Sequence, residues 1–242
     1  MAVCLSGLVA WFGYDSFKRS QVIDDSTWRM YQTAGTDSKH AHQAVEAEAM
    51  WTSALKEADR IFPNNDMRTA KTCHDLGELK HLEHGDYAGA EQLFQRCLEI
   101  RSKNLSPDDR DMADIYGHLG AVKGELGKHD EALTLLDKAI AIAEKTDKEL
   151  SLHYQLLKAD ELISQRKYDE AEAVAKKLVA VRKGEEFGES NENLAFALEK
   201  LGYVYAVQDL YDQCIPLYKR AQKIRENGKH TLNHHYPWAP QG

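Results

Sequence analysis

Cysteine and proline are scarce in this chain of 242 residues, which contains 4 Cys, 5 Pro and 15 Gly. Four cysteines in a chain of this length do not make the dense disulfide framework of a small secreted domain. The low glycine and proline content excludes a collagen-like or low-complexity chain. Because 43% of the residues are hydrophobic, the chain can bury a sizeable core, which excludes wholesale disorder.

Positive charge is also limited, with 31 Lys and Arg against 39 Asp and Glu and a formal net charge of −8. This balance argues against sequence-independent nucleic-acid binding, which requires basic side chains to neutralise phosphates. The chain has no Gly-x-Ser-x-Gly nucleophile motif, no His-Glu-x-x-His zinc motif and no glycine-rich phosphate loop. We therefore expect no catalytic residues and no cofactor, and predict that the protein is not an enzyme.

A single long apolar run, AVCLSGLVAWFGY, occupies residues 2–14. As a helix it would span about 20 Å, which is short of the roughly 30 Å hydrocarbon core of a membrane. A secretory signal would carry Lys or Arg before this run, whereas here Lys18 and Arg19 follow it. Two interpretations of residues 1–23 stay open. They are a signal or anchor remnant of an exported or membrane-tethered protein, or an apolar end packed on a cytoplasmic domain, so the localisation is not determined.

Small residues recur along the rest of the chain with a long period. Five anchors are spaced 43, 42, 39 and 43 residues apart. A second small residue lies twelve or thirteen positions before each anchor. The anchors are Ala47, Ala90, Ala132, Ala171 and Cys214, and the preceding small residues are Gly35, Gly77, Gly120, Ala159 and Gly202. Repeats of this length are typical of solenoid proteins.

Within each repeat, apolar residues recur every three or four positions, which is the period of an amphipathic helix. In residues 115–145 the pattern is interrupted near Gly127. Each repeat is therefore predicted to be two antiparallel helices joined by a tight turn. Gly120 and Ala132 would let the two helices of one hairpin approach closely. A single hairpin cannot bury its apolar face alone, so the hairpins are expected to stack.

These hairpins resemble tetratricopeptide repeats in the longer form, of about 42 residues, found in kinesin light chains and many bacterial repeat proteins. The resemblance rests on Leu-Gly pairs at 76–77, 119–120 and 201–202 and on the linker RSKNLSPDDRDMA at 101–113. It implies an all-α, right-handed α-solenoid over residues 24–226. The five hairpins are expected at about 26–62, 67–105, 110–146, 150–183 and 191–226, followed by an irregular tail at 227–242.

The resemblance also implies a concave groove lined by the first helix of each hairpin. Its groove positions are Lys71, His74, Asp75 and Glu78, then Asp114, His118 and Ala121, then His153, Leu156 and Asp160, and finally Phe196, Glu199, Lys200 and Tyr203. A polar surface with a few aromatic anchors suits an extended peptide of another protein. The acidic side chains of this predicted groove favour a basic partner.

We therefore predict a protein–protein interaction scaffold or adaptor that holds a peptide segment of a partner in this groove. Three alternatives stay open: solvated helix faces that bind nothing, a homo-oligomeric structural module that associates through its end helices, and an accessory domain of an enzyme. Membrane contact is expected only through the apolar residues at the amino terminus.

Histidines and cysteines raise two further possibilities. His81 and His84 lie three residues apart, and His230, His234 and His235 lie in the tail. Because zinc needs three or four converging ligands, we expect no metal at either group. Cys73 and Cys97 lie twelve residues on either side of Gly85. A disulfide between them is an alternative to buried thiols that pack as small apolar residues.

Overall fold

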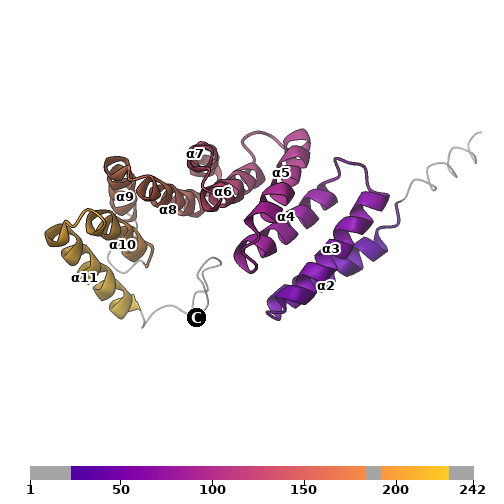
Figure 1. Cartoon of the computed structure of the whole chain (residues 1–242), viewed down its shortest axis with the longest axis horizontal. Helices are drawn as coiled ribbons and strands as arrows, with labels where there is room; N and C mark the ends of the chain where they lie inside the picture. The colour runs from indigo at the N-terminus through magenta and orange to yellow at the C-terminus, as the bar shows by residue number, and fades with distance from the viewer. Residues whose placement is uncertain (1–22, 184–191, 229–242) are drawn as a thin grey trace, which may run out of the picture. The chain divides into compact units, whose positions relative to one another are not determined.

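The computed structural model describes residues 23–183 and 192–228, and this part of the chain consists of α-helices without strands (Figure 1). The helices are α2 (Ser26–His40), α3 (Ala44–Ile61), α4 (Met67–Leu82), α5 (Tyr87–Asn104), α6 (Arg110–Glu125), α7 (His129–Thr146), α8 (Lys148–Ser164), α9 (Tyr168–Lys183), α10 (Glu192–Ala206) and α11 (Tyr211–Gly228). The apolar residues at the amino terminus and the tail after 228 lie outside the described residues. None of the described helices has the length and apolarity needed to cross a membrane.

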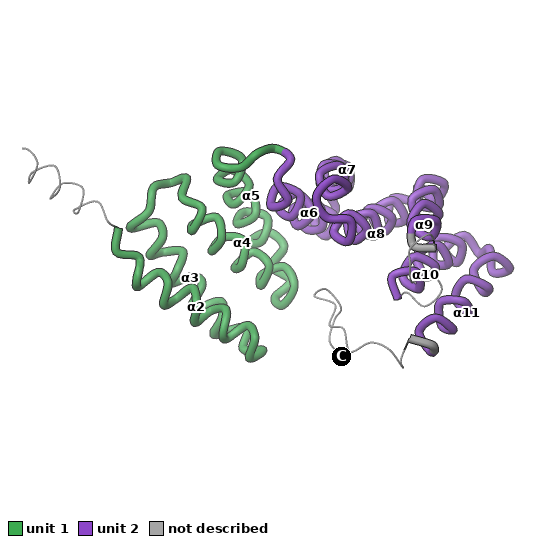
Figure 2. Tube along the Cα trace, turned by 180° about the vertical axis from the view of Figure 1, so that it is seen from behind, with its two compact units in different colours: residues 1–107 green, residues 108–242 purple. Residues whose placement is uncertain are grey.

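The chain divides into two compact units, residues 1–107 and 108–242 (Figure 2). Unit 1 holds the hairpins α2–α3 and α4–α5, and unit 2 holds α6–α7, α8–α9 and α10–α11. Within each unit, every helix packs on the helices that precede and follow it in sequence. In unit 2 the first helices of successive hairpins also touch, α6 with α8 and α8 with α10. This nearest-neighbour packing is that of an α-solenoid, and the predicted fold class is confirmed.

Glycine on the first helix of a hairpin makes room for a large side chain on the second. A Cβ atom at Gly35 would lie 2.6 Å from the Trp51 ring, and one at Gly77 would lie 2.8 Å from the Phe94 ring. At Gly120 it would meet Leu136 at 2.9 Å. The close helix approach expected at Gly120 is therefore present, and in these three hairpins the large side chain four residues after the anchor fills the space.

The turns between paired helices share one backbone conformation. One residue in each has a positive φ, between 56° and 71°: His42, Gly85, Gly127, Arg166 and Asp209. Glycine adopts this left-handed region without steric cost, and three of the five turns place another residue there. The left-handed residue reverses the chain at the end of each first helix, so the second helix runs back along it.

The cysteines of the described residues carry thiols and form no disulfide. Cys73, Cys97 and Cys214 are all buried. The disulfide alternative for Cys73 and Cys97 is therefore wrong, because both side chains pack in the core as small apolar residues. Burial raises the pKa of the Cys73 thiol to about 11.

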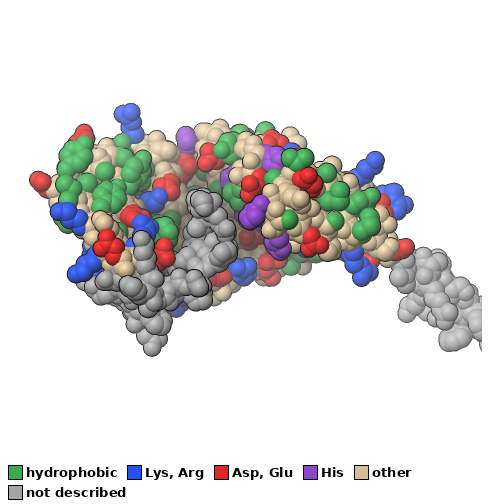
Figure 3. All heavy atoms as spheres, turned by 90° about the horizontal axis from the view of Figure 1, so that it is seen from below, with side chains coloured by type: hydrophobic (Ala, Val, Ile, Leu, Met, Phe, Trp, Pro, Cys, Tyr) green, Lys and Arg blue, Asp and Glu red, His purple; other side chains and the backbone are tan. Residues whose placement is uncertain are grey.

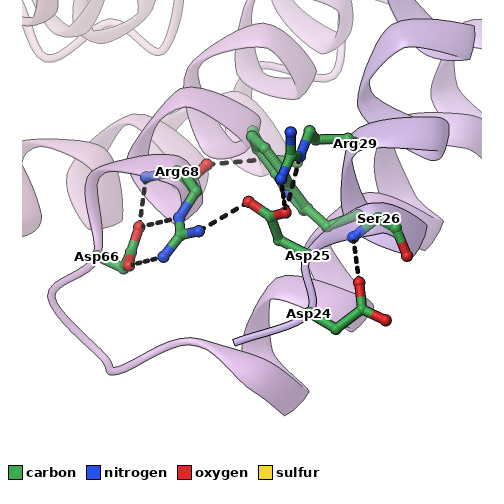
Figure 4. Close-up of polar contacts among 8 residues, drawn as sticks. Asp24, Asp25, Ser26, Arg29, Asp66 and Arg68 are labelled. Atoms are coloured by element: carbon green, nitrogen blue, oxygen red, sulfur yellow. Dashed lines mark hydrogen bonds and ion pairs between the residues drawn. The ribbon is translucent and has the colours of Figure 1, made fainter. Parts of the chain in front are cut away.

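A polar network ties the hairpins of unit 1 together at the start of α2 and α4 (Figure 4). Arg68 donates to Asp25 at 2.9 Å and to Asp66, the residue before α4, at 2.8 Å. Its guanidinium lies 3.7 Å from the centre of the Phe62 ring, at the end of α3. The hydrogen bond from Arg68 lowers the pKa of the Asp66 carboxyl. One arginine therefore joins α2, α3 and α4.

Candidate functional site

Four of the predicted groove residues lie on α4 of unit 1, where they pair with other residues of that unit. The Nζ atom of Lys71 lies 2.8 Å from the Asp75 carboxylate, and His74 Nδ1 lies 3.5 Å from it. Glu78 accepts a hydrogen bond of 2.8 Å from Lys39 on α2. The charges expected to face a partner are thus largely compensated inside unit 1.

Asp75 has the most enclosed carboxylate on this face. Burial alone would raise the pKa of its carboxyl, but hydrogen bonds from His74 and Lys71 outweigh that effect and the pKa is lowered. The carboxylate is ionised at neutral pH and serves as an acceptor for its own neighbours. It therefore offers a basic partner less attraction than its position in the sequence indicated.

Asp114 and His118 lie one turn apart on α6 in unit 2. His118 Nε2 is 3.6 Å from the Asp114 carboxylate. Neither residue lines the depression described next.

Seven of the predicted groove residues come together in unit 2. They line one depression of about 420 Å³, which we call the α8–α10–α11 depression. Its lining residues are His153, Leu156, Leu157 and Asp160 on α8, Phe196, Glu199, Lys200 and Tyr203 on α10, and Tyr218 on α11. The residues of α8 and of α10 recur at spacings of three and four, so each helix presents one face. Packing of α8 against α10 brings the two faces together.

The charged side chains at the edge of this depression are paired with one another. Lys200 donates to Asp160, and Arg225 of α11 forms two hydrogen bonds to Glu199, one of them 2.8 Å long. The Arg225 guanidinium also lies 4.8 Å from the centre of the Phe196 ring. Such a cation–π contact adds an attraction between the arginine and the ring. The edge is therefore close to neutral, and the lining between these pairs is mainly apolar.

Two tyrosine rings are the exposed anchors of the depression. Tyr203 is 47% exposed and Tyr218 is 37% exposed. Within the described residues, neither hydroxyl makes a hydrogen bond. Each ring therefore offers both an apolar face and a polar group to a binding partner.

His153 contributes no positive charge at neutral pH. Burial, together with a smaller effect of the neighbouring His118, lowers the pKa of its imidazole to about 4. The neutral ring retains one donor and one acceptor nitrogen.

Tyr218 was missed by the sequence analysis because it lies on the second helix of its hairpin. A Cβ atom on Gly202 would lie 3.2 Å from its ring. Tyr218 stands four residues after the anchor Cys214, as Trp51 and Phe94 stand four residues after theirs. Those two rings are at most 2% exposed. An aromatic residue four positions after the anchor, together with a glycine on the first helix of the hairpin, was the sequence signal that could have identified Tyr218.

Family models for the tetratricopeptide repeat match residues 69–111 and 111–184. The chain is a tetratricopeptide-repeat protein. The resemblance based on the Leu-Gly pairs and the linker is thus confirmed. The tetratricopeptide repeat builds protein–protein interaction scaffolds, and the fold supports that general role for this chain.

Relatives of this tetratricopeptide-repeat protein share only part of their length with it. Histone-binding protein N1/N2 of Xenopus laevis is 32% identical over 79 residues, which is 33% of this chain and 13% of that protein. Because the match spans so little of the relative, the activity of the whole relative is not transferred to this chain.

Solved structures resemble the chain in fold. Kinesin light chain-like repeats of Podosopora anserina superpose with a TM-score of 0.73 at 16% identity, over 84% of this chain and 97% of theirs. YrrB, described as a tetratricopeptide-repeat protein with an unusual peptide-binding site, gives a TM-score of 0.53 at 17% identity, over 82% of this chain and 87% of its own. These likenesses establish a fold of the kinesin-light-chain type.

Proposed function

We propose that this tetratricopeptide-repeat protein is an adaptor whose α8–α10–α11 depression binds a peptide segment of another protein. The observation that carries the proposal is the exposure of Tyr203 and Tyr218 beside Leu156, within an edge whose charges are already paired. Tyrosine is among the side chains that most often dominate the energy of binding at protein interfaces. The peptide places an apolar or aromatic side chain between the rings, and its backbone hydrogen-bonds to their hydroxyls.

The same arrangement supports binding rather than catalysis. A catalytic site would bring a nucleophile within hydrogen-bond reach of a base. The depression instead combines aromatic rings, leucines and two ion pairs. We therefore propose no catalytic role for it.

We further propose that the peptide is basic. The chain carries a formal net charge of −8, and its Xenopus relative is named as histone-binding. At the depression, the Asp160 side chain is 48% exposed although it pairs with Lys200. A basic side chain of the peptide can share this carboxylate, because an exposed ion pair is weak and exchanges readily.

The test starts with the selection of peptides from a random-sequence display library on the full chain. Calorimetry then measures the affinity of a selected peptide for the wild type and for Tyr203→Ala. We expect at least about a tenfold loss of affinity, because removal of a central aromatic anchor costs more than about 1 kcal/mol. The matched control is Val181→Ala, an exposed apolar residue on α9 outside the depression.

Selected peptides that bind Tyr203→Ala as tightly as the wild type would contradict the proposal. So would selection that yields no binding peptide. A basic residue common to the selected peptides would support the proposed charge, and a predominance of acidic peptides would refute it.

A further inference from the structure

Helix α11 carries an apolar stripe that no described residue covers. Tyr211, Ile215 and Tyr218 are 56%, 47% and 37% exposed. Their spacing of four and three residues places them on one face of the helix. We call these three residues the α11 stripe. Hydrophobic side chains gather on the surface of the part of unit 2 that contains α11 (Figure 3).

The preceding hairpin shows what covers such positions inside the unit. One repeat earlier, Glu172 stands at the position of Ile215 and Ala175 at that of Tyr218. Glu172 accepts a hydrogen bond of 2.9 Å from Tyr205 of α10, and Ala175 is buried against the same helix. A helix therefore packs on this face of α9. The α11 stripe is the corresponding surface, and it is more apolar than the one on α9.

The first helix of a second copy does not suit this surface. If copies stacked head to tail, α2 would occupy the place that α10 takes on α9. The α10 residues Val204 and Tyr205 are buried there, whereas α2 has Asp37 and Ser38 at the corresponding positions. Burying Asp37 against an apolar stripe would remove a carboxylate from water without a compensating charge. Head-to-tail stacking is therefore unfavourable.

The stripe is instead complementary to itself. If two α11 helices pack antiparallel about the stripe, Ile215 of each copy lies opposite Tyr218 of the other. Asp212 and Lys219 lie seven residues apart, along one edge of the stripe, and both are exposed. In this register Asp212 of each copy faces Lys219 of the other, which gives two identical ion pairs across the contact. Neither side chain forms an ion pair within the described residues.

We propose that the α11 stripe is a self-association surface through which two copies of the chain form a dimer with two-fold symmetry. A contact in which the same patch serves both partners closes on itself and does not continue into a polymer. The contact shares Tyr218 with the α8–α10–α11 depression. Because each copy contributes mainly one helix, the dimer is expected to be weak and to form as concentration rises.

The test measures the mass of the full chain by sedimentation over a concentration range from about 5 to about 500 μM, the range in which a weak dimer dissociates. The wild type is expected to rise from 27.4 kDa toward twice that mass. Ile215→Glu places a charge at the centre of the stripe and is expected to stay monomeric. Val45→Glu, at a residue 72% exposed on α3, is the matched control and is expected to dimerise normally. Circular dichroism establishes that each variant is folded.

A charge exchange tests the register. Asp212→Lys is expected to weaken the dimer at least about tenfold, since it sets like charges opposite each other. Asp212→Lys combined with Lys219→Asp is expected to restore it, because the exchanged pair has the same geometry. Three results would each overturn the proposal: a wild type that stays monomeric throughout, a dimer that Ile215→Glu leaves intact, or a mass that grows beyond two copies. Failure of the double variant to restore the dimer would overturn the antiparallel register.

Discussion

The environment of His153 changes the acid–base chemistry of its side chain. Its pKa is about 4 in the folded protein, mainly because of burial, against about 6.5 in an unfolded chain. Between these two pH values the unfolded chain binds a proton that the folded protein does not. The free energy of unfolding therefore decreases as the pH falls from about 6.5 to about 4.

This effect predicts a difference between the wild type and His153→Gln, which keeps a polar side chain but cannot titrate. On lowering the pH from 7 to 4, we expect the wild type to lose about 1–3 kcal/mol more stability than the variant. Urea unfolding at both pH values measures it. His40→Gln, at an exposed residue at the end of α2, is the control and should follow the wild type. Equal pH dependence of the wild type and His153→Gln would disprove the effect.

At the same scale, the candidate site was only partly predictable. The resemblance to tetratricopeptide repeats placed His153, Phe196 and Tyr203 at groove-facing positions, and all three line the α8–α10–α11 depression. It could not reveal that Glu199 is held by Arg225, a residue 26 positions away on another helix. Long charged side chains reach many neighbours, so their partners depend on packing rather than on spacing.

At the scale of the helix, glycine sets how closely neighbouring hairpins pack. A Cβ atom on Gly117 of α6 would lie 2.1 Å from the Tyr154 ring on α8. We therefore expect Gly117→Ala to lower the free energy of unfolding by about 1–3 kcal/mol, because the ring must leave its packed position. Thermal and urea unfolding measure the loss.

A double-mutant cycle isolates this contact. Tyr154→Leu alone should destabilise the protein because it leaves a cavity. Combined with Gly117→Ala, the smaller side chain gives space to the new methyl group. The double variant should therefore lose less stability than the two single variants added together. Strict additivity would mean that the two residues do not meet.

The helices themselves were the most predictable part of the chain. The apolar periodicity of the helices is strong. A close approach of two helices requires a small residue such as Gly77, and this residue is visible in the sequence. The turns were harder to predict from the sequence, because Arg166 and Asp209 adopt the same left-handed conformation as Gly127. When the packing of two helices enforces a turn, the turn does not require glycine, so the sequence carries no glycine to mark it.

At the scale of the whole molecule, stability is divided among neighbours because each described helix packs on helices close to it in sequence. Arg68 joins α2, α3 and α4 through Asp25, Asp66 and the Phe62 ring. We expect Arg68→Ala to increase amide hydrogen exchange in α2 and α4 while leaving exchange in α10 and α11 unchanged. Mass spectrometry of peptides after timed exchange measures it.

The control for this prediction is Arg60→Ala, which removes an exposed arginine whose partner among the described residues is Glu57 on its own helix. It should alter exchange little, because an exposed pair within one helix contributes little to stability. If Arg68→Ala raised exchange equally in all helices, the molecule would behave as one cooperative block rather than as a series of neighbours.

The packing of each helix on its sequence neighbours also has a mechanical consequence. In unit 2, α10–α11 is held mainly by α8 and α9, so tension applied along the chain acts first on that contact. Peeling one hairpin away leaves the contacts of α6 and α7 intact. Extension under force should therefore proceed as a succession of small steps, one hairpin at a time. Such a chain lengthens gradually under force, whereas a globular domain unfolds in a single event.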